Sequence, residues 1–236
     1  MLAQRYPTAY DGIMAGAPAI YWTEFFASIQ WPQQFMEMTG KYPHGCEIDA
    51  MVAGALSACD GLDGVVDGII AKSTDCLGHF DPFALIGDSF HCPQTNSTMR
   101  ITEAAAAVVN ATWQGMTTEQ GERGWYGLLP PADLTGNSPT SYGQPGVAAT
   151  NCTAGTCTGQ AVTLGLQWLQ LFVAKDPTLD LSNLTHAEFD TFVHQSGQEF
   201  RSIISTDDPN LTRFRNAGGK MITFHGLVSL TPWFLV

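Results

Sequence analysis

The run from residue 60 to residue 70 contains the residue types and spacing that most clearly point to chemistry. Asp60, Asp63 and Asp67 are each followed by a glycine, and no lysine or arginine lies between them. Like charges held this close repel one another unless a cation lies between them. Carboxylate and carbonyl oxygens are the ligands that calcium prefers. The run therefore predicts one calcium ion bound by the three aspartates and the carbonyls of Val65 and Ile69, because glycines let the backbone turn sharply.

A plain loop is the alternative interpretation of this run. Aspartate and glycine are also the ordinary residues of turns. The spacing differs from that of an EF-hand loop, which alternates oxygen ligands and ends in a glutamate. Because no acid–base partner lies within the run, we expect a calcium ion there to be structural rather than catalytic.

The composition narrows the class of partner. The chain has 236 residues, a formal net charge of -12 and only 10 lysines and arginines. Nucleic acids and anionic membrane surfaces bind basic patches, so neither is expected as a partner. No apolar run approaches the roughly 20 residues that span a bilayer. The length suffices for one large domain or for a core with an insertion.

Two features indicate a secreted protein. The first is a set of Asn-x-Ser/Thr motifs, the acceptor sites of N-glycosylation. They lie at Asn96, Asn110, Asn151, Asn183 and Asn210. The second is an even number of cysteines, 6, which is typical of disulfide-bonded proteins. Residues 1–7 lack a basic start followed by an apolar stretch, so we expect the signal peptide and the true N-terminus to lie outside this sequence.

The cysteines are expected to form disulfides rather than a metal site. No two of them are spaced as Cys-x-x-Cys, so neither a zinc site nor a thioredoxin-like site is expected. Sequential pairing is the simplest of the many connectivities that remain open. It joins Cys46 to Cys59, Cys76 to Cys92, and Cys152 to Cys157.

Helical patterns dominate the middle of the chain, and strand patterns lie near its ends. Apolar spacing, caps and stops predict helices over 23–38, 47–58, 102–113, 161–174, 185–200 and 211–216. Residues 1–6 are typical of a helix end, and Pro32 is expected to kink or split the first long helix. The ranges 10–15 and 220–224 are predicted as strands, the first of them buried, and 121–158 is expected to be rich in loops.

This order of elements predicts an α/β fold interrupted by a large insertion. We expect a partial core at 1–24, a mostly helical and loop-rich lid at 25–216, and a partial return to the core at 217–236. Neither terminal piece has enough strands for a sheet of its own. The prediction is therefore a fragment of a larger α/β protein.

Several short segments together resemble the tannase and feruloyl esterase family. They are 3–7, 10–13, 15–19, 59–70, 80–82, 125–127 and 220–226. The resemblance implies an α/β-hydrolase core with a large lid, a calcium loop at 59–70, and hydrolysis of phenolic acid esters such as galloyl and feruloyl esters. It also implies an acyl-enzyme formed on a serine, with a histidine as base and an aspartate that orients it.

By the same resemblance, the catalytic triad is absent from this sequence. The family's serine would lie upstream of Met1. Leu227–Ser229 follow Gly226 where the family has its aspartate, and the sequence stops at Val236, before the position of the family's histidine. We therefore expect a carboxylic ester hydrolase by family, and a 236-residue chain that is inactive by itself.

The remaining histidines and serines offer no clear catalytic group. His225 follows a predicted strand and is expected to be a turn residue rather than a base. His79 and His91 flank cysteines, but their spacing is not that of a zinc site. No serine lies in a Gly-x-Ser-x-Gly elbow. The serines considered are Ser28, Ser57, Ser89 and Ser141.

Aromatic residues form two groups with different expected roles. Trp125 and Tyr126 lie in a glycine-flanked loop and are candidates for a phenolic substrate pocket. A second group has helical spacing and is expected to form core rather than pocket. It consists of Trp22, Phe25, Phe26, Trp31 and Phe35.

The sequence as a whole predicts part of a secreted carboxylic ester hydrolase that acts on phenolic esters. Two readings from other classes remain open. One is a non-catalytic module that binds phenolic or cell-wall polymers, which retained polymer binding without turnover would indicate. The other is a calcium-stabilised structural or interaction protein, for which polymer binding would also be absent.

Overall fold

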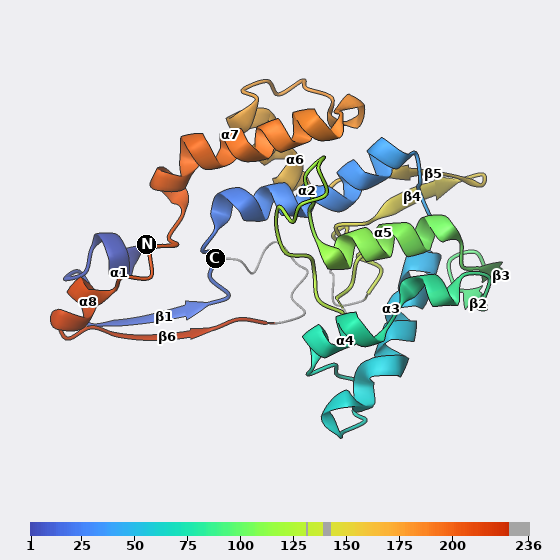
Figure 1. The fold of residues 1–236 in the computed structure, drawn as a ribbon, viewed down its shortest axis with the longest axis horizontal. Helices are drawn as coiled ribbons and strands as arrows, with labels where there is room; N and C mark the ends of the chain where they lie inside the picture. The colour runs from blue at the N-terminus through green and yellow to red at the C-terminus, as the bar shows by residue number, and fades with distance from the viewer. Residues whose placement is uncertain (131, 139–142, 227–236) are drawn as a thin grey trace.

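A long central helix, α2 (Trp22–Thr39), organises the helical part of the molecule. It contacts α5 (Glu103–Gln114), α6 (Thr163–Gln167) and α7 (His186–Ile204). In Figure 1, α7 lies above α2 and α5 lies below it. The computed structural model describes residues 1–130, 132–138 and 143–226.

The predicted helix at 23–38 is present, but Pro32 does not split it. Pro32 lies inside α2 as one of ten buried residues of that helix. A proline in a helix removes one backbone hydrogen bond. Its neighbours Trp31 and Gln33 are only 3% and 2% exposed, so packing on the flanking turns outweighs that loss.

The other predicted helices are also present, and three of them, α3 (Gly45–Cys59), α5 and α7, begin at a side-chain cap. Thr102 Oγ1 accepts a hydrogen bond from the Ala105 N–H at 3.3 Å at the start of α5. Thr185 and Glu188 form the predicted capping box at the start of α7. The remaining helices are α1 (Leu2–Arg5), α4 (Ser73–His79) and α8 (Thr212–Asn216).

Short helical segments of other kinds connect these helices. Those in the described residues include the 3-10 turns η1 (Asp60–Asp63), η2 (Pro82–Leu85) and η5 (Leu181–Asn183). Another, η4 (Trp168–Val173), is a π-helix that continues α6. The helix predicted over 161–174 therefore changes its hydrogen-bond pattern half-way, and the Ala174 N–H bonds to the Leu169 carbonyl at 2.8 Å.

The hydrophobic core lies between α2, α3, α5 and α7. Its fully buried side chains include Ile48, Val108, Leu169 and Phe189. The aromatic residues expected in the core are there. Phe26 and Trp31 are buried, and Trp22, Phe25 and Phe35 are partly buried against them.

The two predicted strands near the ends of the sequence pair with each other. β1 (Gly12–Gly16) and β6 (Lys220–Phe224) are parallel neighbours at the left of Figure 1. The expectation that the first strand is buried is wrong for the described part of the chain, because Met14 is 78% exposed. A parallel strand is buried only where layers cover both faces of its sheet. Here each strand has a single strand neighbour among the described residues.

Two antiparallel hairpins were not predicted. They are β2 (Ser89–Cys92) with β3 (Ser97–Arg100), and β4 (Thr150–Thr153) with β5 (Thr156–Gly159). These strands are short and rich in serine, threonine and asparagine, so they lack the apolar alternation that identifies a strand. The Cys46–Cys92 disulfide ties the first hairpin to α3, and the Cys152–Cys157 disulfide links the two strands of the second hairpin.

Sequential pairing of the cysteines is wrong for two of the three disulfides. Cys46 pairs with Cys92 and Cys59 pairs with Cys76, whereas Cys152 pairs with Cys157 as expected. Cys46 and Cys59 lie at opposite ends of α3. At 1.5 Å per residue, their backbones are separated by roughly 20 Å, far beyond the reach of a disulfide.

Some expectations lie outside what the structure describes. Leu227–Ser229, the remaining residues to Val236, and Ser141 fall outside the described residues. The boundaries of the core pieces and the lid stay predictions. In the described part of the chain, no helix combines the length and apolar character needed to cross a membrane.

Candidate functional site

The acidic run forms a compact loop at the end of α3, and Asp60 is its centre. The Asp60 carboxylate accepts hydrogen bonds from the backbone N–H groups of Asp67, Gly68 and Ile69 at 3.0–3.2 Å. Asp63 likewise accepts from the Val65 N–H at 2.9 Å. The loop therefore folds back on Asp60. The backbone N–H groups that point at its carboxylate supply part of the positive charge that the run lacks in its sequence.

The glycines of the loop are needed for its backbone. Gly64 and Gly68 have φ angles of 94° and 82°, a region that side chains strain. The base of the loop is held by the Cys59–Cys76 disulfide and by Ile70, which is 2% exposed. A rigid base and a turning backbone are what a structural metal loop requires, and also what a stable plain turn requires.

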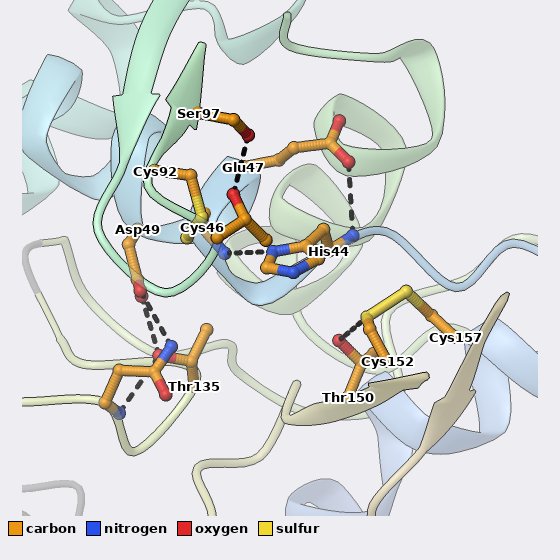
Figure 2. The surroundings of a disulfide bond; sticks show 12 residues. His44, Cys46, Glu47, Asp49, Cys92, Ser97, Thr135, Thr150, Cys152 and Cys157 are labelled. Atoms are coloured by element: carbon orange, nitrogen blue, oxygen red, sulfur yellow. Dashed lines mark hydrogen bonds between the residues drawn. A yellow bond between two sulfur atoms is a disulfide. The ribbon is translucent and has the colours of Figure 1, made fainter. Parts of the chain in front are cut away.

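The three aspartates do not form a tight cluster in this structure. Among the described residues, one group of three potential side-chain ligands lies within 4.8 Å, namely His44, Cys46 and Cys92. Its cysteines are joined in a disulfide, so it is not a metal site (Figure 2). The acidic loop fits a calcium ion in the chemistry of its oxygen donors, and calcium binding there stays a prediction.

Aromatic side chains gather where the chain leaves β1. Tyr21 is the residue before α2, and its ring lies 5.2 Å from that of Trp125. Trp125 also contacts Tyr126 at 5.6 Å, and the Arg123 guanidinium lies 5.7 Å from the Tyr126 ring. Tyr126 is 68% exposed, so this aromatic cluster presents a ring face to solvent.

The loop that carries Trp125 and Tyr126 is held directly against the end of α5. The Trp125 N–H bonds to the Met116 carbonyl at 3.1 Å. A side chain at Gly127 would place its Cβ 2.2 Å from the Trp113 carbonyl oxygen, and one at Gly115 would meet Trp125 at 2.3 Å. These close approaches explain the glycine after the two aromatic residues and the glycine at the end of α5, and they hold the two backbones together.

The aromatic cluster is joined to the parallel strand pair through Tyr21, which follows the carboxyl end of β1 in the chain. β1 ends at Gly16, and the next N–H, of Ala17, bonds to the Phe224 carbonyl at the end of β6 at 2.7 Å. Ligands of open α/β sheets bind outside the carboxyl ends of the strands. Tyr21, which is part of this cluster, was not singled out from the sequence. The sequence feature that could have identified it is its position as an aromatic residue between a predicted strand and a predicted helix.

A second polar cluster lies beside the Cys46–Cys92 disulfide. Asp49 accepts hydrogen bonds from Thr135 Oγ1 at 2.6 Å and from Asn137 Nδ2 at 2.8 Å (Figure 2). Burial raises the pKa of Asp49 above its ordinary value, the nearby Asp133 adds to the shift, and these two hydrogen bonds oppose it. The cluster joins α3 to the segment around residue 135.

The structure does not bring the other candidates together. His225 Nδ1 lies 2.9 Å from the Gly226 carbonyl, and the residue is exposed just after β6. His79 ends α4 and His91 lies in β2. In the part of the chain that the structure describes, no serine hydroxyl is hydrogen-bonded to an imidazole. Ser28 instead donates to the Phe25 carbonyl at 2.8 Å.

Comparison with known proteins decides the family. A model of the tannase and feruloyl esterase family matches residues 1–229. This chain belongs to that family. A probable feruloyl esterase of Arthroderma benhamiae is 35% identical over 95% of this chain, and a tannase of Aspergillus oryzae is 25% identical over 94%. The match spans 39% and 42% of those two relatives.

Solved structures agree with the family assignment. A tannin acyl hydrolase from Aspergillus niger superposes with a TM-score of 0.84 and 27% identity, covering 96% of this chain and 40% of that protein. A feruloyl esterase B from Aspergillus oryzae matches with a TM-score of 0.70 at 21% identity, which shows a shared fold. This member of the family thus has the same fold as the corresponding two-fifths of those enzymes.

Proposed function

We propose that this chain is part of a carboxylic ester hydrolase that acts on phenolic acid esters. The observation that carries the proposal is the aromatic cluster of Tyr21, Trp125 and Tyr126, which Tyr21 joins to the carboxyl end of β1. Offset and tilted aromatic contacts stabilise a bound ring by about 0.5–1.5 kcal/mol beyond its area burial. Membership of an esterase family supports the same assignment.

In this proposal the cluster binds the ring of the acyl group and holds the ester carbonyl toward the nucleophile. The Arg123 guanidinium, which lies against Tyr126, keeps that ring in place and faces the electron-rich phenol. The nucleophile is a serine activated by a histidine, and acyl transfer passes through an acyl-enzyme. The described residues contain no hydrogen-bonded serine–histidine pair, so we infer that the 236-residue chain alone does not hydrolyse esters.

The exposure of the strand pair supports a place within a larger sheet. Met14, Ile222 and Phe224 are 78%, 70% and 62% exposed. A pair of parallel strands is marginal in water by itself, and parallel sheets are normally covered on both faces. We infer that further strands and helices of the parent hydrolase cover these side chains.

Calcium binding is the second part of the proposal. Asp60, Asp63 and Asp67, with the carbonyls of Val65 and Ile69, would hold one ion that stabilises the lid. A hard cation prefers this all-oxygen donor set. The ion would neutralise the three carboxylates and would take no part in the chemical step. Addition of calcium should raise the melting temperature of the wild-type chain, and Asp63→Asn should abolish that increase.

Ligand binding tests the aromatic cluster. Tyr126→Ala should weaken binding of methyl ferulate, measured by calorimetry, by roughly tenfold, the effect of about 1.4 kcal/mol. Tyr10→Ala is the matched control, because Tyr10 is a 54% exposed tyrosine outside the cluster. Equal affinities for the two variants would refute the assignment of the cluster.

Turnover tests the inferred lack of activity. The chain should release no p-nitrophenol from a phenolic ester above the rate of buffer. Release that a serine-directed inhibitor abolishes would overturn this inference and leave the family assignment intact.

A non-catalytic binding module is the second candidate, favoured by the exposed ring of Tyr126 and the lack of a serine–histidine pair in the described residues. Binding of the chain to insoluble phenolic polymers that is lost in Tyr126→Ala would favour this candidate over the esterase, provided that a polypeptide extended with the remaining family segments releases no free acid from those polymers.

A further inference from the structure

A cavity of about 510 Å³ lies between the second half of α2 and the start of α7, away from the aromatic cluster. Its apolar wall includes Trp31, Phe35 and Met38. No lysine, arginine, aspartate or glutamate lines it, and its one titratable side chain, His186, is already bound through Nε2 to the Thr117 carbonyl at 2.7 Å. A cavity of this volume and lining suits a small neutral ligand with an apolar face.

Asn183 belongs to the rim of this cavity and to the motif Asn183-Leu184-Thr185. Its Nδ2 donates to Asp180 Oδ2 at 2.9 Å, and Asp180 in turn accepts from the Ser182 N–H at 2.9 Å. The amide nitrogen has two hydrogens, so it can keep this bond after one hydrogen is replaced by a sugar. The bond would then fix the direction in which the sugar leaves the side chain.

The other acceptor motifs differ in their surroundings. Asn96 lies in the turn between β2 and β3 with a φ of 49°, and Asn210 precedes α8. Both are exposed, as is Asn151 in β4, and none of these three lines this cavity or the second described one. Asn110 lines that second cavity, which has a volume of about 240 Å³. Asn183 is therefore the motif that combines an exposed acceptor with the larger apolar groove.

We propose that this groove holds the first N-acetylglucosamine of a glycan attached to Asn183. In the attachment, Nδ2 bonds to C1 of the sugar, the bond from C1 to a lipid diphosphate carrier breaks, and the amide proton is lost. The apolar face of the sugar and its acetyl methyl group pack on Phe35 and Met38, which line the groove and are only partly buried. The covalent tether makes this contact intramolecular, so weak packing suffices to keep the groove filled.

The seated sugar covers apolar surface of α2 and links it to the start of α7. The glycan at Asn183 thus stabilises the fold, whereas glycans at Asn96 and Asn210 only cover the surface. This assignment is independent of the esterase activity, because it concerns a groove that the proposed catalytic role does not use.

Thermal unfolding of the full chain, secreted from a host that attaches N-glycans and trimmed to one sugar per site, tests the proposal. Asn183→Gln should lower the melting temperature by about 2–4 °C, the shift that a small loss of stability causes in a domain of this size. Asn96→Gln and Asn210→Gln are matched controls and should shift it by about 1 °C or less. Thr185→Ser retains both the motif and the helix cap, and should behave as the wild type.

Two further measurements keep the proposal falsifiable. In a host without N-glycosylation, Asn183→Gln and wild type should melt together, which separates the sugar from the side chain. In the glycosylated chain, one acetyl methyl resonance should be shifted upfield by the aromatic rings, and this shift should disappear in Asn183→Gln and diminish in Phe35→Leu. Equal melting shifts at Asn183 and Asn96, no shifted methyl resonance, or an unmodified Asn183 beside a modified Asn96 would each overturn the proposal.

Discussion

The helical region around α2 and the parallel strand pair differ in where their apolar side chains lie. α2 buries ten of its 18 residues, whereas all five residues of β6 are exposed. A helix satisfies its backbone within itself and needs only packing partners, which α5, α6 and α7 supply. A parallel strand needs neighbours in the sheet and layers on both faces. The helical region therefore contains its own core, whereas among the described residues the strand pair has no covering layers.

Truncation of one apolar side chain in each region should break or support this comparison most strongly. Phe189→Ala removes a fully buried ring of α7 and should lower the free energy of unfolding by about 3–5 kcal/mol. Ile222→Ala in β6 removes a side chain that is 70% exposed and should cost about 0.5 kcal/mol or less. Urea denaturation of the chain measures both.

The same β6 substitution sharpens the comparison in a longer polypeptide. If further family segments cover the strand pair there, Ile222→Ala should cost about 2–4 kcal/mol instead. A cost that is equally small in both contexts would contradict the proposed larger sheet.

Removal of each disulfide in turn should lower the free energy of unfolding by an amount that grows with the length of the loop it closes. The Cys46–Cys92, Cys59–Cys76 and Cys152–Cys157 bonds close loops with sequence separations of 46, 17 and 5. Loop-closure entropy predicts losses of about 4, 3 and 2 kcal/mol for the corresponding double cysteine-to-alanine variants. A larger loss for the hairpin disulfide than for the other two would contradict this ranking.

Substitution of the buried carboxylate Glu47 should also lower the free energy of unfolding, by a smaller amount. Glu47 is 5% exposed and accepts hydrogen bonds from the His44 N–H at 3.1 Å and the Thr102 N–H at 2.8 Å, which joins the starts of α3 and α5. Glu47→Ala should cost about 2–3 kcal/mol, because both donors lose a charged partner. Glu47→Gln keeps one acceptor and should cost less. A loss for Glu47→Ala with none for Glu47→Gln would show that packing, and not the carboxylate's charge, matters.

The smallest expected effect is a dependence of stability on pH through Asp49. Its pKa is raised above the ordinary value of 3.8 in the folded chain, chiefly by burial. The folded chain thus holds this proton more tightly than the unfolded chain, so the contribution of Asp49 to stability falls as the pH rises above 3.8 toward the folded pKa. Asp49→Asn should flatten the profile in that window, measured by denaturation at each pH. An unchanged profile would exclude Asp49 as its source.

Local patterns explain which parts of the fold could be predicted. Thr185 with Glu188, and Thr102 before an alanine-rich stretch, identified the starts of α7 and α5 because caps act within one turn. The acidic loop was likewise found from adjacent residues. The hairpins at Ser89–Arg100 and Thr150–Gly159 were missed, because their short polar strands carry no apolar alternation.

The sequence by itself determined the helices, their caps, the glycine-dependent acidic loop and the family resemblance, since each rests on residues close together in the chain. Only the tertiary structure decided the pairing of Cys46 with Cys92 and the contact of Tyr21 with Trp125. It also decided the exposure of Ile222. These features depend on which distant segments lie together, and a disulfide, a ring contact or a covered strand face forms wherever the packing of helices places its partners.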